Sequence, residues 1–147
     1  MKRTDFTLAQ LTFAEARPAI EAIRRQVFIE EQQVPEELEW DGLDEDAVHL
    51  LVTTGDGAPV ATARLLPNGH IGRMAVLTQW RGQGVGTAML KHLLEIARAQ
   101  QLSRVFLNAQ VSAEGFYAKA GFRSKGEPFM DAGIPHKRMV LELARID

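Results

Sequence analysis

The stretch that most constrains the fold is glycine-rich and reads Gly-Gln-Gly-Val-Gly at residues 82–86. It follows an apolar run at residues 71–76 that is typical of a strand, and it leads into residues 85–97, where apolar side chains recur at helical spacing. Glycine lets a backbone approach a ligand closely, and the first turn of a helix carries unpaired N–H groups and the positive end of the helix dipole. The stretch therefore predicts a strand, a loop and a helix that together bind a phosphate or pyrophosphate.

The spacing of the glycines narrows the identity of this phosphate. A Walker A loop needs Lys and then Ser or Thr after its last glycine, whereas Gly86 is followed by Thr87 and Ala88. A dinucleotide fingerprint needs Gly-x-Gly-x-x-Gly, whereas these glycines alternate, so ATP, GTP and NAD are all disfavoured. What remains is Arg-x-x-Gly-x-Gly, in which Arg81 adds a forked cation at the mouth of the loop. A glycine-rich turn that only begins a helix is the other interpretation.

Composition bounds the class of protein. A chain of 147 residues, 46% of them apolar, predicts one domain spanning residues 1–147. A net charge of −2 without any basic run argues against a nucleic-acid partner. No apolar stretch approaches transmembrane length and no signal-peptide core follows Met1, so we expect no membrane association and a cytoplasmic location. The chain has no cysteine and its four histidines are scattered, so we predict neither a Cys-bound acyl intermediate nor a metal site.

The rest of the chain predicts a mixed order of strands and helices. Short turns make the first strands an antiparallel meander, and a long helix permits a parallel neighbour after it. Pro18 is predicted to open the first helix, and Pro35 to mark either its end or the start of a second short helix. The predicted strands are residues 6–13, 48–52, 59–66, 71–76, 103–107, 122–127 and 137–143; the predicted later helices are residues 85–97 and 113–120, the second capped by Gly121; and a loop is predicted at residues 128–136.

Two motifs and this order of elements resemble the GCN5-related N-acetyltransferase (GNAT) superfamily over nearly all of the chain. The motifs are Arg-x-x-Gly-x-Gly at residues 81–86 and Phe-Tyr-x-x-x-Gly-Phe at residues 116–122. The resemblance implies a mixed α/β fold (α+β) with a predominantly antiparallel sheet of about six to seven strands and about four helices. It also implies that the fourth and fifth strands splay apart around acetyl-CoA. The pairs Glu31-Gln32 and Asp41-Gly42, with Gly-Ile-Pro-His at residues 133–136, resemble the ElaA-like bacterial branch.

The same resemblance assigns the residues that bind acetyl-CoA, the expected cosubstrate. It implies that the main chain of Met74, Ala75 and Val76 pairs with the pantetheine arm. It implies that the pyrophosphate is bound by the N–H groups of Arg81, Gly82, Gln83, Gly84, Val85, Gly86 and Thr87. Asn108, at the end of a predicted strand beside the cleft, either bonds the pantetheine amides or caps a turn.

The catalytic groups are harder to assign. Tyr117, the only tyrosine, stands where the family places the acid that protonates the departing thiolate. A phenol pKa near 10 lies above a thiol pKa near 8.5, so the hydroxyl keeps its proton at neutral pH; a tyrosine packed on the sheet is the alternative. Many relatives use a glutamate of the fourth strand as general base, but this strand reads Gly72-Arg73-Met74. The remaining candidates for the base are Glu31, Glu39, Asp41 and His136.

The acceptor is expected to be an amine of a small molecule or peptide. From Gln26 to Ala63 the chain has no Lys or Arg but many acidic residues, which either steer a cationic amine or form a solvated face. The sequence thus predicts an acetyl-CoA-dependent N-acetyltransferase, as a monomer or a homodimer, that transfers acetyl directly. A non-catalytic acyl-CoA-binding regulatory or sensor module is the alternative, and a phosphate-binding structural protein is a weaker one.

Overall fold

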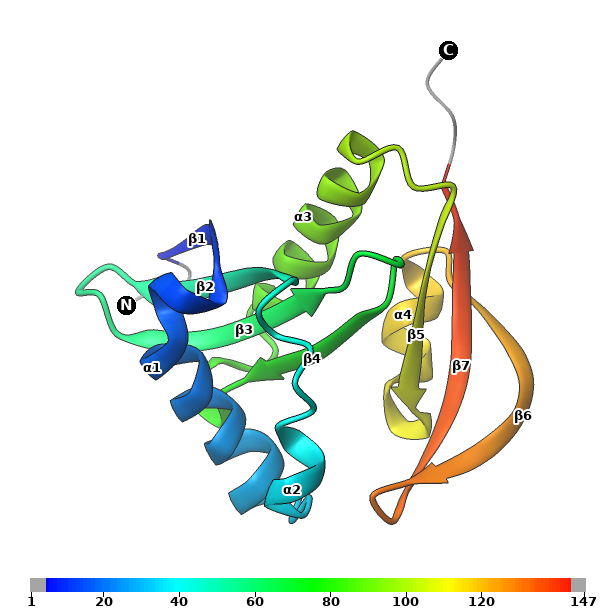
Figure 1. Cartoon of the computed structure of the whole chain (residues 1–147), viewed down its shortest axis with the longest axis horizontal. Helices are drawn as coiled ribbons and strands as arrows, with labels where there is room; N and C mark the ends of the chain where they lie inside the picture. The colour runs from blue at the N-terminus through cyan, green and yellow to red at the C-terminus, as the bar shows by residue number, and fades with distance from the viewer. Residues whose placement is uncertain (1–4, 144–147) are drawn as a thin grey trace.

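The computed structural model describes residues 5–143, which form two sheets that stand side by side and diverge (Figure 1). The strands of the described chain are β1 (Phe6–Leu11), β2 (Val48–Thr54), β3 (Pro59–Leu65), β4 (Ile71–Val76), β5 (Arg104–Gln110), β6 (Arg123–Asp131) and β7 (Ile134–Glu142). Its α-helices are α1 (Phe13–Arg24), α2 (Glu36–Glu39), α3 (Val85–Ala99) and α4 (Glu114–Lys119). A π-helix, η1 (Arg25–Glu31), and two 3-10 turns, η2 (Thr78–Trp80) and η3 (Val111–Ala113), complete the elements. The predicted mixed α/β fold is confirmed.

In the described chain, the main chains of the two sheets pair at one point, just before β4 and near the beginning of β5. The first sheet has the order β1-β2-β3-β4 and the second β5-β7-β6, and all neighbouring strands within them are antiparallel. Between β4 and β5 there is a single parallel bridge, His70 to Phe106, and the Phe106 N–H donates to the Gly69 carbonyl at 3.0 Å. The parallel pairing permitted by the sequence is therefore limited to this point, and beyond it the two strands separate.

Helix α1 begins at Phe13, so the prediction that Pro18 opens the helix is wrong. The start is fixed by a capping box, in which Thr12 Oγ1 accepts the Glu15 N–H at 3.2 Å and Glu15 Oε1 accepts the Thr12 N–H at 2.8 Å. Pro18 lies inside the helix, and the predicted strand at residues 6–13 ends at Leu11 for the same reason. The Thr-x-x-Glu signal was present in the sequence and outweighs the proline.

The predicted loop at residues 128–136 is also wrong, because β6 and β7 run through it and meet in a tight hairpin. Ala132 and Gly133 both have positive φ, 51° and 77°, as a two-residue hairpin turn requires. Pro128 is tolerated because β6 is an edge strand with irregular register there. Pro135 lies beyond Gln110, the last residue of β5 that pairs with β7, so β7 has only one neighbour at that point.

The first sheet is covered on both faces, which leaves the free edge of β4 as its open side. Successive residues of β2 show this, since Leu50 and Val52 pack with α3 while Leu51 packs with α1. Helix α3 buries Val85, Met89, Leu90, Leu93, Leu94 and Ala97. In the described part of the chain, no helix is both long enough and apolar enough to cross a membrane.

Candidate active site

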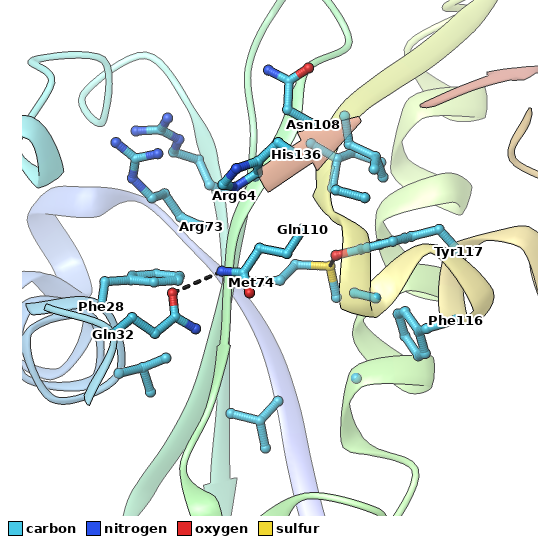
Figure 2. A pocket seen from close by; sticks show the side chains of 18 of the residues that line it. Phe28, Gln32, Arg64, Arg73, Met74, Asn108, Gln110, Phe116, Tyr117 and His136 are labelled. Carbon is cyan, nitrogen blue, oxygen red and sulfur yellow. Dashed lines mark hydrogen bonds between the residues drawn. The ribbon is translucent and has the colours of Figure 1, made fainter. Parts of the chain in front are cut away.

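A cavity of about 750 Å³ occupies the gap where β4 and β5 diverge. It reaches from the first turn of α3 to η1 on one side and to the β6–β7 hairpin on the other. Figure 2 shows side chains from both halves of the molecule pointing into it. Of the residues predicted to act, it is lined by Met74, Val76, Arg81, Gly82, Gly84, Val85, Gly86, Thr87, Asn108, Tyr117 and His136, as well as Glu39. It is not lined by Ala75, Gln83, Glu31 or Asp41.

The edge of β4 presents backbone groups to this cavity. The Leu77 N–H donates to the Val60 carbonyl at 2.9 Å, and in an antiparallel ladder the backbone groups of alternate residues face the partner strand. Ala75 therefore faces β3, whereas the N–H and C=O of Val76 face the gap. The register slips between Thr62 and Arg64, and Arg73 has φ of 51°, so β4 carries a bulge with a left-handed non-glycine residue. This bulge was not predicted, although Gly72 inside the strand pattern is a signal that could have indicated it.

The loop before α3 offers backbone N–H groups without acceptors. Gly84 is the N-cap with φ of 85°, it supplies no side-chain cap, and the first helical bond runs from the Ala88 N–H to the Gly84 carbonyl at 3.0 Å. The N–H groups of residues 85–87 therefore have no acceptor within the helix. A Cβ atom on Gly82 or Gly84 would meet nothing within 4 Å, so the space before the loop is open. This arrangement suits an anion such as a diphosphate.

The guanidinium of Arg81 is bound to a carboxylate rather than pointing freely from the loop mouth. Its terminal nitrogens lie 2.7 Å from both carboxylate oxygens of Glu31, and its Nε donates to the Val76 carbonyl at 2.8 Å. The hydrogen bond from Arg81 lowers the pKa of Glu31, against the effect of burial. Both side chains are 40% exposed. Arg81 thus connects the loop, the end of β4 and the end of η1.

Tyr117 points across the cavity from α4 to β4. Its hydroxyl donates to the Met74 sulfur at 3.5 Å, and Figure 2 shows the two groups facing each other. The ring packs edge-on against Phe116 and Phe122, at 5.0 and 6.0 Å between centroids. Burial raises the pKa of Tyr117 to about 12, so the phenol stays protonated and is a hydrogen-bond donor at any working pH.

A hydrogen bond crosses the cavity between the two halves. Gln110 Nε2, at the end of β5, donates to Gln32 Oε1, just after η1, at 2.9 Å (Figure 2). Sequence reasoning missed both glutamines as partners, although Gln32 belongs to the Glu-Gln pair of the ElaA-like resemblance.

Asn108 does not cap a turn with its side chain; instead its Oδ1 accepts from Arg138 Nε on β7 at 3.1 Å.

The acidic block from Gln26 to Ala63, which was expected either to steer a cationic amine or to form a solvated face, has its carboxylates beside the cavity paired with guanidiniums. Arg24, which is fully buried, bonds Glu39 at 2.7 Å and Asp44 at 2.6 Å. Two more guanidiniums, on Arg64 and Arg73, extend this network by binding Asp41. Glu39 and Asp44 are therefore structural ion-pair partners that hold residues 36–44 on the sheet.

Asp41 is the most strongly shifted carboxyl of this network. Arg64 bonds it through two nitrogens at 2.9 and 3.0 Å, and Arg73 bonds it at 3.2 Å. Burial alone would raise the pKa of Asp41, but the hydrogen bonds from Arg64 and the Leu43 N–H, with the charges of Arg64 and Arg73, lower it from 3.8 to about 2. Arg73 Nε lies 3.2 Å from Glu39 Oε2 without a hydrogen bond to it.

His136 enters the cavity from the start of β7. Its Nδ1 lies 2.7 Å from the Ile134 carbonyl, which can only accept, so Nδ1 carries the proton and Nε2 has the free lone pair in the neutral ring. Its ring lies 6.0 Å from Phe129 at an interplanar angle of 23°. In residues 5–143, no group of three or more His, Asp or Glu side chains is arranged to hold a metal ion.

Comparison with known proteins identifies the family. A family model described as an acetyltransferase (GNAT) domain matches residues 7–143. The chain belongs to the GNAT family. The predicted resemblance is confirmed, and this GNAT protein is an acetyltransferase.

Relatives of this GNAT acetyltransferase cover nearly its whole length. The uncharacterized N-acetyltransferase YjcF of Bacillus subtilis (strain 168) is 39% identical over 122 residues, which are 80% of this chain and 86% of YjcF. Among solved structures, Escherichia coli ElaA is 31% identical with a TM-score of 0.83, covering 92% of this chain and 99% of ElaA. An acyl-CoA N-acyltransferase from Pseudomonas aeruginosa is 33% identical with a TM-score of 0.78, covering 92% and 97% of the two chains.

Proposed function

We propose that this GNAT acetyltransferase transfers the acetyl group of acetyl-CoA directly to a primary amine of a small molecule or peptide. The observation that carries the proposal is the continuity of one cavity from the helix N-terminus at Gly84 to the hydroxyl of Tyr117 and the imidazole of His136. An anion-binding loop, an open strand edge and two proton-transfer groups thus border the same space.

The loop and the strand edge would hold the cosubstrate. The N–H groups of Val85, Gly86 and Thr87 suit the diphosphate, and the outward N–H of Val76 suits a carbonyl of the pantetheine arm, whereas the Val76 carbonyl already accepts from Arg81 Nε. The bulge at Arg73 and Met74 turns the strand at the point where Tyr117 reaches it, which would bring the thioester beside the phenol.

Of the four candidates for the general base, His136 fits best. Glu39 is held by Arg24, Glu31 is held by Arg81, and Asp41 is held by Arg64 and Arg73. The pKa values of Glu31 and Asp41 are lowered, so these carboxylates accept protons poorly at neutral pH. The Nε2 lone pair of His136 is free of such a partner among the described residues.

The transfer proceeds by direct attack of the neutral amine on the thioester. The amine nitrogen bonds to the thioester carbonyl carbon while the carbon–sulfur bond breaks, and one amine proton passes to His136 Nε2. The departing thiolate accepts a hydrogen bond from the Tyr117 hydroxyl and takes its proton from the solvent, to which His136 releases the proton that it received. Because the pKa of Tyr117 is about 12, the phenol acts chiefly as a hydrogen-bond donor to the developing thiolate.

The experiment is a panel of amines with released thiol as the readout. The protein contains no cysteine, so it adds no background to a thiol reagent. Amine-dependent release that falls at least tenfold in His136→Gln supports the proposal. Release that is unchanged in this variant would remove His136 from the mechanism.

A non-catalytic acyl-CoA-binding module remains the second candidate function, because no described residue of β4 is a carboxylate and Glu31 and Asp41 are paired. Tight binding of acetyl-CoA by calorimetry, with no thiol release for any amine, would favour that module. Absence of binding would contradict both functions.

A further inference from the structure

The charge beside the acceptor end of the cavity differs from what the acidic block predicts. We define this end by Arg64, Arg73, Asn108 and His136, which Figure 2 shows away from Tyr117. The three carboxylates that lie against it, Glu39, Asp41 and Asp44, are paired with three guanidiniums. Those of Arg24 and Arg64 are buried, and that of Arg73 is 26% exposed. A cationic amine therefore finds no unpaired carboxylate in this network.

Arg138 is an exposed cation that does not itself line the cavity but borders this end through Asn108, and it has no carboxylate partner among residues 5–143. Its guanidinium lies 4.9 Å over the ring of Phe106, and its Nε donates to Asn108 at 3.1 Å. These contacts fix the plane of the group, while its two terminal nitrogens make no hydrogen bond within the described chain. Its cross-strand neighbour on β6 is Lys125, which adds a second positive charge.

The imidazole of His70 reports the local potential. It lines the cavity and stacks on Phe106 at 4.8 Å, so both it and Arg138 lie against one ring. Burial lowers the pKa of His70, and the charges of Arg64, Arg138 and Arg73 lower it further, against a smaller opposite effect of Asp41. The three guanidiniums thus outweigh the carboxylate of Asp41 at the His70 ring.

We propose that the acceptor is a small amine that carries a carboxylate, and that Arg138 binds this carboxylate beside His136. A planar guanidinium with free terminal nitrogens can donate two parallel hydrogen bonds to the two oxygens of a carboxylate. A substrate that carries an ammonium or an uncharged group in place of the carboxylate cannot accept this pair of bonds. The inference rests on the proposed function, because it assigns the amine of the same substrate to His136.

The spacing of the two residues limits the size of this acceptor. His136 and Arg138 are alternate residues of β7, so their side chains stand on the same face, together with Asn108 and Gln110 of the paired strand. Their Cα atoms are separated by about 7 Å along the strand. The carboxylate should therefore lie only a few bonds from the amine, as in an amino acid.

The test compares amines that differ only in the carboxylate. Each of several amino acids is assayed beside its carboxamide, with the wild type, Arg138→Gln and Lys125→Gln. Glutamine at position 138 can still donate to Asn108, and the Lys125 variant removes the same charge from the neighbouring strand. We expect Arg138→Gln to raise KM for the amino acids at least tenfold, with KM for the carboxamides nearly unchanged, and Lys125→Gln to change either by less than threefold.

A second readout does not need turnover. The N-acetylated amino acids keep the carboxylate, so their binding to the three proteins is measured by calorimetry. Loss of this binding in Arg138→Gln alone supports the inference even if the thiol assay were to refute the proposed function. Equal activity with amino acids and carboxamides, or equal effects of the two variants, would overturn the inference and leave the proposed acetyl transfer standing.

Discussion

Two glycines of the cofactor loop, two positions apart, should respond in opposite ways to the same added methyl group. Gly84 has φ of 85° and is the N-cap of α3, whereas Gly86 lies in the first turn of the helix and is not among the residues with positive φ. A Cβ on Gly84 would meet nothing within 4 Å, and a Cβ on Gly86 would meet the Phe116 ring at 3.5 Å, an ordinary contact. The loop therefore needs glycine at position 84 for its backbone, but not at position 86.

The free energies of unfolding follow from these geometries. Holding alanine in the left-handed region costs about 1–2 kcal/mol, so Gly84→Ala should destabilise the free protein by about that amount. Replacing a helical glycine by alanine stabilises by about 0.5–1 kcal/mol, so Gly86→Ala should gain about 0.5 kcal/mol at the start of a helix. For a chain of this size, 1 kcal/mol moves Tm by roughly 3 °C, so the two variants should differ by about 5–7 °C.

Thermal unfolding with and without CoA measures both the stability of each variant and its affinity for CoA. At about one hundred times Kd, CoA should stabilise the wild type by about 2.7 kcal/mol. Gly86→Ala should keep most of this gain, because its methyl group turns toward Phe116. Gly84→Ala should lose at least about 1.4 kcal/mol of it, a tenfold loss of affinity, because its methyl group enters the open space before the loop. A stable Gly84→Ala that binds CoA normally would refute the assignment of this loop.

Three further results are expected. Tyr117→Phe should lower kcat by about a hundredfold without changing CoA affinity, since only the donor to the thiolate is lost; an unchanged kcat from pH 6 to 9 would contradict its role. Asp41→Asn should cost about 1–2 kcal/mol in urea unfolding at pH 7, because the gap between pKa 3.8 and about 2 is worth roughly 2.4 kcal/mol before screening of a group that is 25% exposed. As its pKa is lowered, this contribution is present above about pH 4 and disappears as the pH falls toward 2, so wild type and variant should converge there. Glu31→Gln should cost less than about 1 kcal/mol, because its ion pair is 40% exposed; a larger cost would show that the pair holds η1 in place.

Local signals in the sequence predicted much of the architecture. The glycine loop, helix α3 and the meander of β2, β3 and β4 follow from hydrophobic periodicity and short turns, which act between near neighbours in the chain. The errors arose where two local signals conflict. At α1 the capping box of Thr12 and Glu15 outweighs Pro18, and at the last hairpin the turn at Ala132 and Gly133 outweighs Pro135.

The contacts that shape the site join residues far apart in sequence, so no local sequence pattern predicts them. Arg81 and Glu31 are 50 positions apart, and Gln110 and Gln32 are 78 apart. The bulge at Arg73 depends on the register in which β3 and β4 pair. The sequence could indicate that a guanidinium stands at the loop mouth, but not that a carboxylate of η1 already binds it.

The charge of the acceptor end shows most clearly why composition along the chain is a poor guide to a site. The block from Gln26 to Ala63 is acidic by itself, yet Arg24, Arg64 and Arg73, which neutralise its buried carboxylates, all lie outside it. Because removal from water costs each ion its hydration, each of these carboxylates depends on its guanidinium partner, and each pair removes one carboxylate from the potential that an incoming substrate meets. Outside this network, the charged groups nearest to this end belong to the other sheet: Asp131, which lines the cavity, and Arg138, whose guanidinium lies over the ring of Phe106. An amine that carries a carboxylate satisfies this arrangement, whereas a simple cationic amine would have to approach an uncompensated guanidinium.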